Sequence, residues 1–198
     1  VTGVEAAKML LVTAGYKADK EGLVGAAWAN KTLGLAEEND LLDDVNTALA
    51  SALPRQYAAQ IIYNALDMDT VKYEDGEVVK NETTKTEMKQ VPNYAADGKT
   101  IMSYSTVATT VTENETVGEK YLDLTTYEAT LTATGKWGTS KDHMIIDTIK
   151  KINNNSLSTP AGPKTLDFSE DLSNMMYQRV KVMTGKNDKV LGVYTLDD

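Results

Sequence analysis

Few residues in this sequence have the types and spacing that catalysis or metal binding requires. The chain of 198 residues has no cysteine and a single histidine, His143. These counts exclude disulfides, thiolate metal sites, a cysteine nucleophile and most multi-histidine metal sites. His143 follows Asp142 and is of the residue type that serves as a general base, but no serine elbow or second histidine accompanies it. We therefore interpret His143 as a structural residue at the start of a strand.

Clustered carboxylates offer acid–base or metal chemistry. The pairs Glu37-Glu38 and Asp43-Asp44 are adjacent in sequence, so they do not face each other across a substrate as glycosidase carboxylates do. The oxygen-rich segment 38–46 contains ligand types that calcium prefers, but it lacks the glycine and the terminal glutamate of an EF-hand. Helix capping is the favoured interpretation of this segment, and calcium is the alternative. The sequence predicts no catalytic residue, no metal ligand and no other cofactor, and hence a protein that is not an enzyme.

Composition narrows the class of partner. Hydrophobic residues make up 41% of the chain, enough for one large or two small domains with real cores. The 29 acidic and 20 basic residues give a net charge of −9, which repels phosphate backbones, and no basic stripe offsets it, so we expect no nucleic-acid partner. No apolar run approaches the roughly 18 residues of a membrane span, so the sequence predicts none.

Threonine separates two regions, because residues 1–66 contain 4 of the 25 threonines and residues 67–198 contain the other 21. The first region is rich in Ala and Leu at helical spacing, which predicts three helices. In the opening helix Thr2 is the N-cap, Glu5 completes a capping box and Gly15 ends the helix. The predicted buried stripe of this helix consists of Ala6, Met9, Leu10 and Ala14.

Two more helices complete the first region. The middle helix is expected over residues 26–39 and contains Trp28, which either stacks on a sugar ring or anchors its helix against a neighbour. The third helix begins at Leu53-Pro54-Arg55, with Ser51 as the expected cap. Its predicted stripe consists of Ala58, Ile61, Ile62, Ala65 and Leu66. An offset of 52 residues aligns the first helix with the third, which indicates a repeat or a chance agreement of two Ala-rich helices.

The region 67–198 has the pattern of short antiparallel strands. An alternating run over residues 71–79 has Asp75-Gly76 at its centre, which predicts a hairpin. Further strands are expected over residues 100–106, 127–134, 144–148, 165–168, 179–184 and 190–196, and residues 185–188 join the last two as a second hairpin. We expect loops over residues 80–98 and 150–159. Trp137 lies on a predicted loop, either as an exposed ligand platform with Tyr121 and Tyr127 nearby in sequence or partly packed. The prediction is an α+β chain with a small barrel or sandwich after the helices.

The helical region resembles S-layer homology domains, the modules of about 55 residues that attach bacterial surface proteins to the cell wall. In that family one helix begins with Trp-Ala and the next with a Thr-Arg-Ala-Glu motif. Here Trp28-Ala29 matches the first, and the segments starting at Val1 and Leu53 match the second. The first copy has Gly3 in place of the motif arginine. The second copy has Arg55 but replaces the motif threonine and glutamate by Pro54 and Tyr57.

The resemblance implies a partner and a site. In the family the motif binds an anionic, often pyruvylated, cell-wall polysaccharide, and neighbouring units complete the pocket. The residues that this implies as ligand-binding are Arg55, Thr2, Glu5 and Trp28. The simpler alternative for Arg55 is a solvated first-turn residue that pairs with a nearby acid.

The predicted organisation is an S-layer-homology-like region over residues 1–66, about one and a half units, and a β domain over residues 67–198. The resemblance implies an extracellular, non-catalytic protein of the cell wall or S-layer of a Gram-positive anaerobe, and a fragment of a longer secreted precursor. Two alternatives stay open. One is the anchor segment of a wall-associated carbohydrate-active enzyme, and the other is a purely structural array element without ligand binding.

Overall fold

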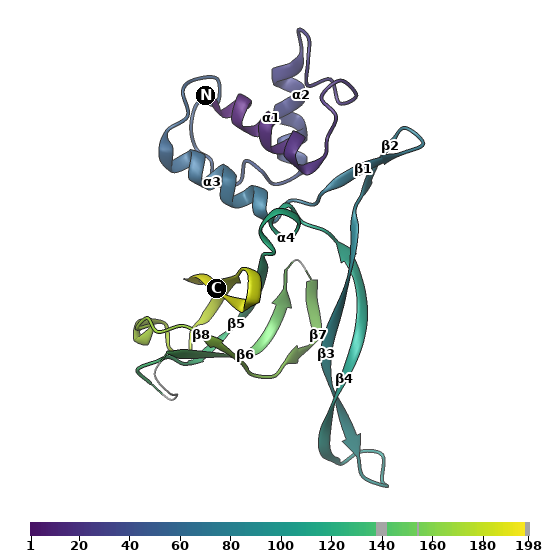
Figure 1. The fold of residues 1–198 in the computed structure, drawn as a ribbon, viewed down its shortest axis with the longest axis vertical. Coiled ribbons are helices and arrows are strands. Elements are labelled where there is room, and N and C mark those ends of the chain that lie inside the picture. The colour runs from purple at the N-terminus through teal and green to yellow at the C-terminus, as the bar shows by residue number, and fades with distance from the viewer. Residues whose placement is uncertain (138–141, 154, 197–198) are drawn as a thin grey trace. The chain divides into compact units, whose positions relative to one another are not determined.

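The chain crosses three times between two units, each of which is built from separate stretches of sequence. The computed structural model describes residues 1–137, 142–153 and 155–196 (Figure 1). Val1–Thr83 and Asn114–Leu122 form the first, here called the helical unit. Thr84–Glu113 and Asp123–Asp198 form the second, here called the sheet unit. The secondary structure changes from helix to strand after Leu66. The helical unit does not end there, because it also includes the residues up to Thr83 and residues 114–122.

Three helices, a hairpin and a short fourth helix form the helical unit. The elements are α1 (Gly3–Ala14), α2 (Trp28–Glu38), α3 (Arg55–Leu66), β1 (Val71–Glu74), β2 (Glu77–Lys80) and α4 (Val117–Leu122). One buried apolar cluster joins them, and it includes Leu11, Leu23, Leu41, Ile61 and Val71. The predicted hairpin at Asp75-Gly76 is confirmed, with Glu74 opposite Glu77 and both central residues at positive φ.

Both predicted ends of α1 are confirmed. Thr2 and Glu5 form the capping box, and Gly15 ends the helix in the left-handed region with φ 114°. The predicted stripe is correct in part, because Ala14 is buried and Leu10 packs against the core. The other buried positions are Val4, Ala7 and Leu11, whereas the predicted Met9 is 55% exposed. Residues 9–12 are all apolar, so periodicity alone does not select the buried face.

The third helix begins and ends as predicted, but its cap and part of its stripe differ. The N-cap is Pro54, and no described side chain, Ser51 included, donates or accepts a capping bond there. Ile61 and Ala65 are buried as predicted, whereas Ile62 is 56% exposed. The bounds of α1 and α3 differ by 52 residues at both ends. Their buried faces do not correspond, since Met9 is exposed where its aligned partner Ile61 is buried.

Six antiparallel strands form the main sheet of the sheet unit. They are β5 (Thr125–Ala133), β6 (His143–Ile152), β7 (Asn155–Ala161), β8 (Lys164–Asp167), β9 (Arg179–Thr184) and β10 (Val190–Thr195). The order is β10-β9-β5-β6, and β6 pairs with β8 through residues 143–146 and with β7 through residues 149–152. Two single 3-10 turns, Ser173–Met175 and Lys186–Asp188, flank β9. The second predicted hairpin, β9–β10, is confirmed.

The α+β class is confirmed, and the expected small barrel is wrong. Among the described strands β10 pairs only with β9, and β7 and β8 pair only with β6, so the sheet stays open. Its apolar face is covered by side chains of the unit itself, such as Leu172, Met175 and Met176 after β8. The unit therefore buries its core without closing a barrel.

Both predicted loops are wrong where the structure describes them. Residues 82–94 form β3 (Glu82–Tyr94), which pairs with β4 (Ile101–Asn114) as a separate two-stranded sheet. Residues 150–159 complete β6 and begin β7, with a turn at Asn153, and Asn154 lies outside the described residues. Both segments are polar, the first through Thr, Lys and Glu and the second through Lys, Asn and Ser, so the apolar alternation that reveals a half-buried strand is missing.

Candidate ligand-binding site

The first residues of α1 lie against the segment that leads into α3. Thr2 and Ala52 form an antiparallel bridge. The Leu53 N–H donates to the Val1 carbonyl at 3.0 Å, and the Val4 N–H donates to the Leu49 carbonyl at 3.1 Å. The two segments that match the family motif therefore meet at their starts.

This pairing explains the glycine at the place of the motif arginine. A Cβ on Gly3 would lie 2.5 Å from Leu49 Cδ2 and 3.0 Å from Leu49 Cα. A side chain at residue 3 therefore needs the Leu49 side chain to shift and the Leu49 backbone to give by a few tenths of an ångström. An arginine at residue 3 would crowd Leu49 in this arrangement, and Arg55 is the arginine at the position that the resemblance points to.

Thr2 and Glu5 bond to each other. The Thr2 N–H donates to Glu5 Oε2 at 2.8 Å, and the Glu5 N–H donates to Thr2 Oγ1 at 3.2 Å. Hydrogen bonds from the Thr2 backbone and side chain lower the pKa of Glu5 below its ordinary value of 4.5. These contacts give both residues a helix-capping role, and a ligand that took either polar group would have to displace a capping bond.

Arg55 is an exposed cation at the start of α3. The chain has two arginines, and the other, Arg179, lies with its Nη2 3.6 Å from Glu128 Oε2. Within residues 1–137, 142–153 and 155–196, Arg55 has no hydrogen bond or ion pair. The first turn of α3 has no acidic residue, so the guanidinium and the positive end of the helix dipole act together. This is the place in the helical unit where a carboxylate would be attracted most directly.

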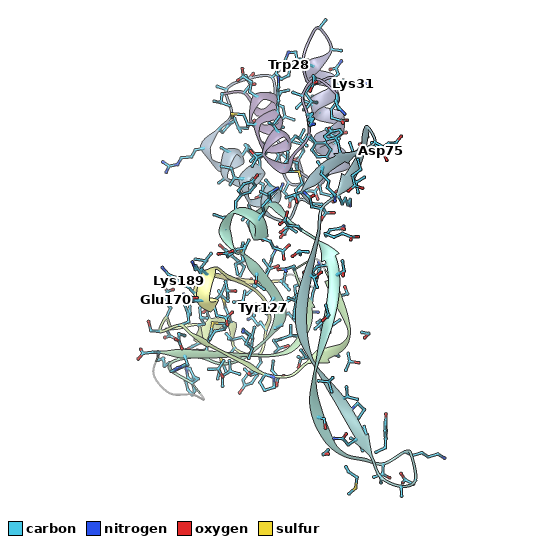
Figure 2. All side chains as sticks on the ribbon, turned by 45° about the vertical axis from the view of Figure 1, so that its right-hand side comes forward. Trp28, Lys31, Asp75, Tyr127, Glu170 and Lys189 are labelled. Carbon is cyan, nitrogen blue, oxygen red and sulfur yellow. The ribbon has the colours of Figure 1, made fainter. Side chains whose placement is uncertain are left out.

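Trp28 lies at the start of α2 and contacts α1. Its ring is half-buried, and Lys8 Nζ of α1 lies 5.2 Å from the ring centroid (Figure 2). This cation–π pair joins two helices, which supports the prediction of an inter-helix anchor. It also places an ammonium group beside the exposed part of the ring.

The structure gives His143 a cross-strand partner. His143 of β6 stands opposite Asp167 of β8, with Nε2 3.1 Å from Asp167 Oδ1. The histidine is half-buried, and Nδ1 has no hydrogen-bond partner among the described atoms. This pairing across strands is consistent with a structural role for His143.

The acidic segment 38–46 serves as a turn. The Asn39 side chain accepts from the Tyr16 hydroxyl and donates to the Leu35 carbonyl, and Asp40 and Asp44 adopt positive φ. The part of the chain that the structure describes contains no group of three His, Asp or Glu side chains placed to hold a metal ion. Capping and turn formation account for these residues.

Trp137 is exposed, whereas Tyr127, one of the two tyrosines near it in sequence, is buried. Trp137 and Thr134 exchange two backbone hydrogen bonds in a tight turn. Tyr127 is buried in the core of the sheet unit, and Tyr121 belongs to the helical unit. Residues 138–141, part of the same predicted loop, lie outside the described residues.

The acidity of the chain belongs to one unit, a feature that was not predicted from the sequence. The helical unit has 16 acidic and 8 basic residues, whereas the sheet unit has 13 and 12. The net charges are therefore −8 and −1. Because each unit consists of two stretches, a count along continuous sequence does not reveal this asymmetry.

No family model, curated protein or solved structure matches this chain. Of the helices described, none has the length and apolar character needed to cross a membrane.

Proposed function

We propose that this protein is a non-catalytic bacterial surface protein whose helical unit attaches to an anionic cell-wall polysaccharide through Arg55. The protein would act outside the cell, at the wall or S-layer of a Gram-positive bacterium. The sheet unit would be a spacer or assembly module. Neighbouring S-layer homology units would complete the attachment site.

One observation carries the proposal. Arg55 is an exposed guanidinium without a described partner, it begins the helix that matches the family motif, and it follows the segment paired with the start of α1. A planar guanidinium binds a carboxylate with two parallel hydrogen bonds, which suits the carboxylates of a pyruvylated sugar.

Because the helical unit is strongly acidic, its attachment to an anionic polysaccharide depends largely on Arg55. A unit with a net charge of −8 repels a polyanion over most of its surface. Attachment therefore depends on short-range contacts at cationic places, such as the start of α3 and the Lys8–Trp28 pair. Loss of Arg55 removes the contact that offsets the repulsion best.

The test is retention of the full chain on purified wall polysaccharide. Removing a charge-assisted hydrogen bond costs about 1.5–3 kcal/mol, so Arg55→Ala should weaken retention at least about tenfold. Lys31→Ala is the matched control, because Lys31 is also an exposed cation of the helical unit and the substitution changes the charge equally. Arg55→Lys should bind with intermediate strength, since it keeps the charge and loses the planar fork.

Two results would contradict the proposal. Equal retention of Arg55→Ala and the unsubstituted chain would remove Arg55 from the site. Absence of binding by the unsubstituted chain would favour the alternative of a structural array element, in which Thr2 and Glu5 only cap α1.

A further inference from the structure

The hairpin of β3 and β4 has two unpaired edges. Its strands have 13 and 14 residues and pair with each other alone among the described strands, and Figure 1 shows them as a two-stranded ribbon. About half of the backbone N–H and C=O groups of each strand point away from the other strand. An isolated two-stranded ribbon is marginally stable in water, so a third strand on either edge would stabilise it.

Most strand edges in this protein carry features that discourage pairing with another chain. The outer strand β7 contains Pro160, and β3 contains Pro92 together with both lysine and glutamate. The outer strand β10 has an irregular register between Val190 and Gly192. The strands β1, β2 and β8 are four residues long and each contains a charged residue. Prolines, charges, bulges and short length are the known protections of edge strands.

Over residues 101–112 the strand β4 lacks three of these protections, namely charge, proline and short length. Residues 101–112 contain no charged residue, no proline and no glycine, and they are rich in Thr, Val and Ser. Ile101, Met102 and Val107 are exposed along it. A long, uncharged strand of high β propensity with a free edge is a template for strand addition.

We propose that the outer edge of β4 pairs antiparallel with β4 of a second copy of this chain, giving a four-stranded sheet in the order β3-β4-β4-β3. An interface of this kind is isologous, so each copy presents the same strand to the other. An uncharged strand is complementary to itself, since no like charges come opposite each other within residues 101–112.

The exposed Lys99, which precedes β4, favours the antiparallel direction. Parallel pairing would bring Lys99 of one copy toward Lys99 of the other, and these like charges would repel. Antiparallel pairing places the two lysines at opposite ends of the interface.

The first test is the oligomeric state of the full chain, measured by sedimentation equilibrium over two decades of protein concentration. We expect a reversible dimer, and Val107→Lys should weaken dimerisation at least about tenfold by placing charge on the interface strand. Val91→Lys is the matched control, because Val91 on β3 has the same 45% exposure as Val107, and it should dimerise like the unsubstituted chain. Circular dichroism verifies that both variants fold.

A second test uses the absence of cysteine from the chain. Single-cysteine variants Met102→Cys and Thr110→Cys have exposed positions on the same face of β4, so no other thiol competes. On mixing and mild oxidation, antiparallel pairing predicts mainly the disulfide between residue 102 of one copy and residue 110 of the other. This readout does not require the Val107 variant to fold.

Three results would overturn the proposal. They are a monomer at every concentration, an equal loss of dimer in Val91→Lys and Val107→Lys, and mainly 102–102 and 110–110 disulfides. Wall binding enters none of these measurements, so failure here leaves the role of Arg55 unaffected.

Discussion

Gly15 should be the glycine of the helical unit that tolerates substitution least. It ends α1 with φ 114°, a region that costs an L-residue about 1–2 kcal/mol. A Cβ there would also lie 2.2 Å from the Val71 carbonyl oxygen. Because Val71 is paired with Lys80 across the hairpin and its side chain belongs to the apolar core, its backbone has little freedom to withdraw.

The two costs of Gly15→Ala add. Overpacking a well-filled site costs about 1–3 kcal/mol, and the left-handed conformation adds about 1–2 kcal/mol. The reduced entropy of the unfolded chain returns about 0.4–1 kcal/mol. We expect Gly15→Ala to lower the free energy of unfolding of the helical unit by about 1–5 kcal/mol, which can be a large part of a typical domain's stability.

Gly25→Ala measures the cost of the left-handed conformation without the cost of overpacking. Gly25 also has positive φ, at 81°, but a Cβ added there would have no atom within 4 Å. We expect a loss of about 1 kcal/mol or less for this variant. The assay is urea unfolding followed at 222 nm, where the signal comes mainly from the helices of the helical unit. Equal losses for the two variants would refute the argument that the carbonyl of Val71 limits residue 15.

Three more predictions test the packing, capping and charge of the two units. Ile61→Ala should lower the free energy of unfolding by about 2–5 kcal/mol, because the side chain is fully buried. Ile62→Ala should change it by about 0.5 kcal/mol or less. Similar values for the two variants in urea unfolding would contradict the assigned buried face of α3. Thr2→Ala should cost about 0.5–2 kcal/mol through loss of the cap of α1, and an unchanged urea midpoint would argue against that cap. In the sheet unit, hydrogen bonds from Lys136 and from the backbone and hydroxyl of Ser173 lower the pKa of Asp171 from 3.8 to about 2. Its stabilisation is therefore present above pH 3.8 and is lost as the pH falls toward 2; Asp171→Asn should unfold with a weaker pH dependence in that range, measured by thermal melting, and an identical dependence would contradict the assignment.

The sequence predicts those features that depend on local chemistry. Thr2 and Glu5 identify the start of α1, Gly15 identifies its end, and Asp75-Gly76 identifies a hairpin, because caps and tight turns need particular residue types at fixed positions. Arg55 is placed correctly at the start of α3 for the same reason.

Features that depend on tertiary packing are missed. The run of apolar residues 9–12 leaves the buried face of α1 undetermined, and packing places Leu11 inside and Met9 outside. The strands β3 and β7 escape detection because their residues are polar. The crowding of a Cβ at Gly3 arises from Leu49, 46 residues away in sequence, and no local pattern reports it.

The path of the chain between the two units has a consequence for biosynthesis. The helical unit is completed by residues 114–122. From these residues the Val117 N–H donates to the Met68 carbonyl, and the Tyr121 hydroxyl donates to the Thr13 carbonyl. N-terminal segments emerge from the ribosome first. After α1 to α3 are made, 30 residues of the sheet unit are therefore synthesised before α4, the last helix of the helical unit. A nascent chain stalled before residue 114 should be open to proteolysis in its helices, and one extended far enough past Leu122 for α4 to leave the ribosome should be protected.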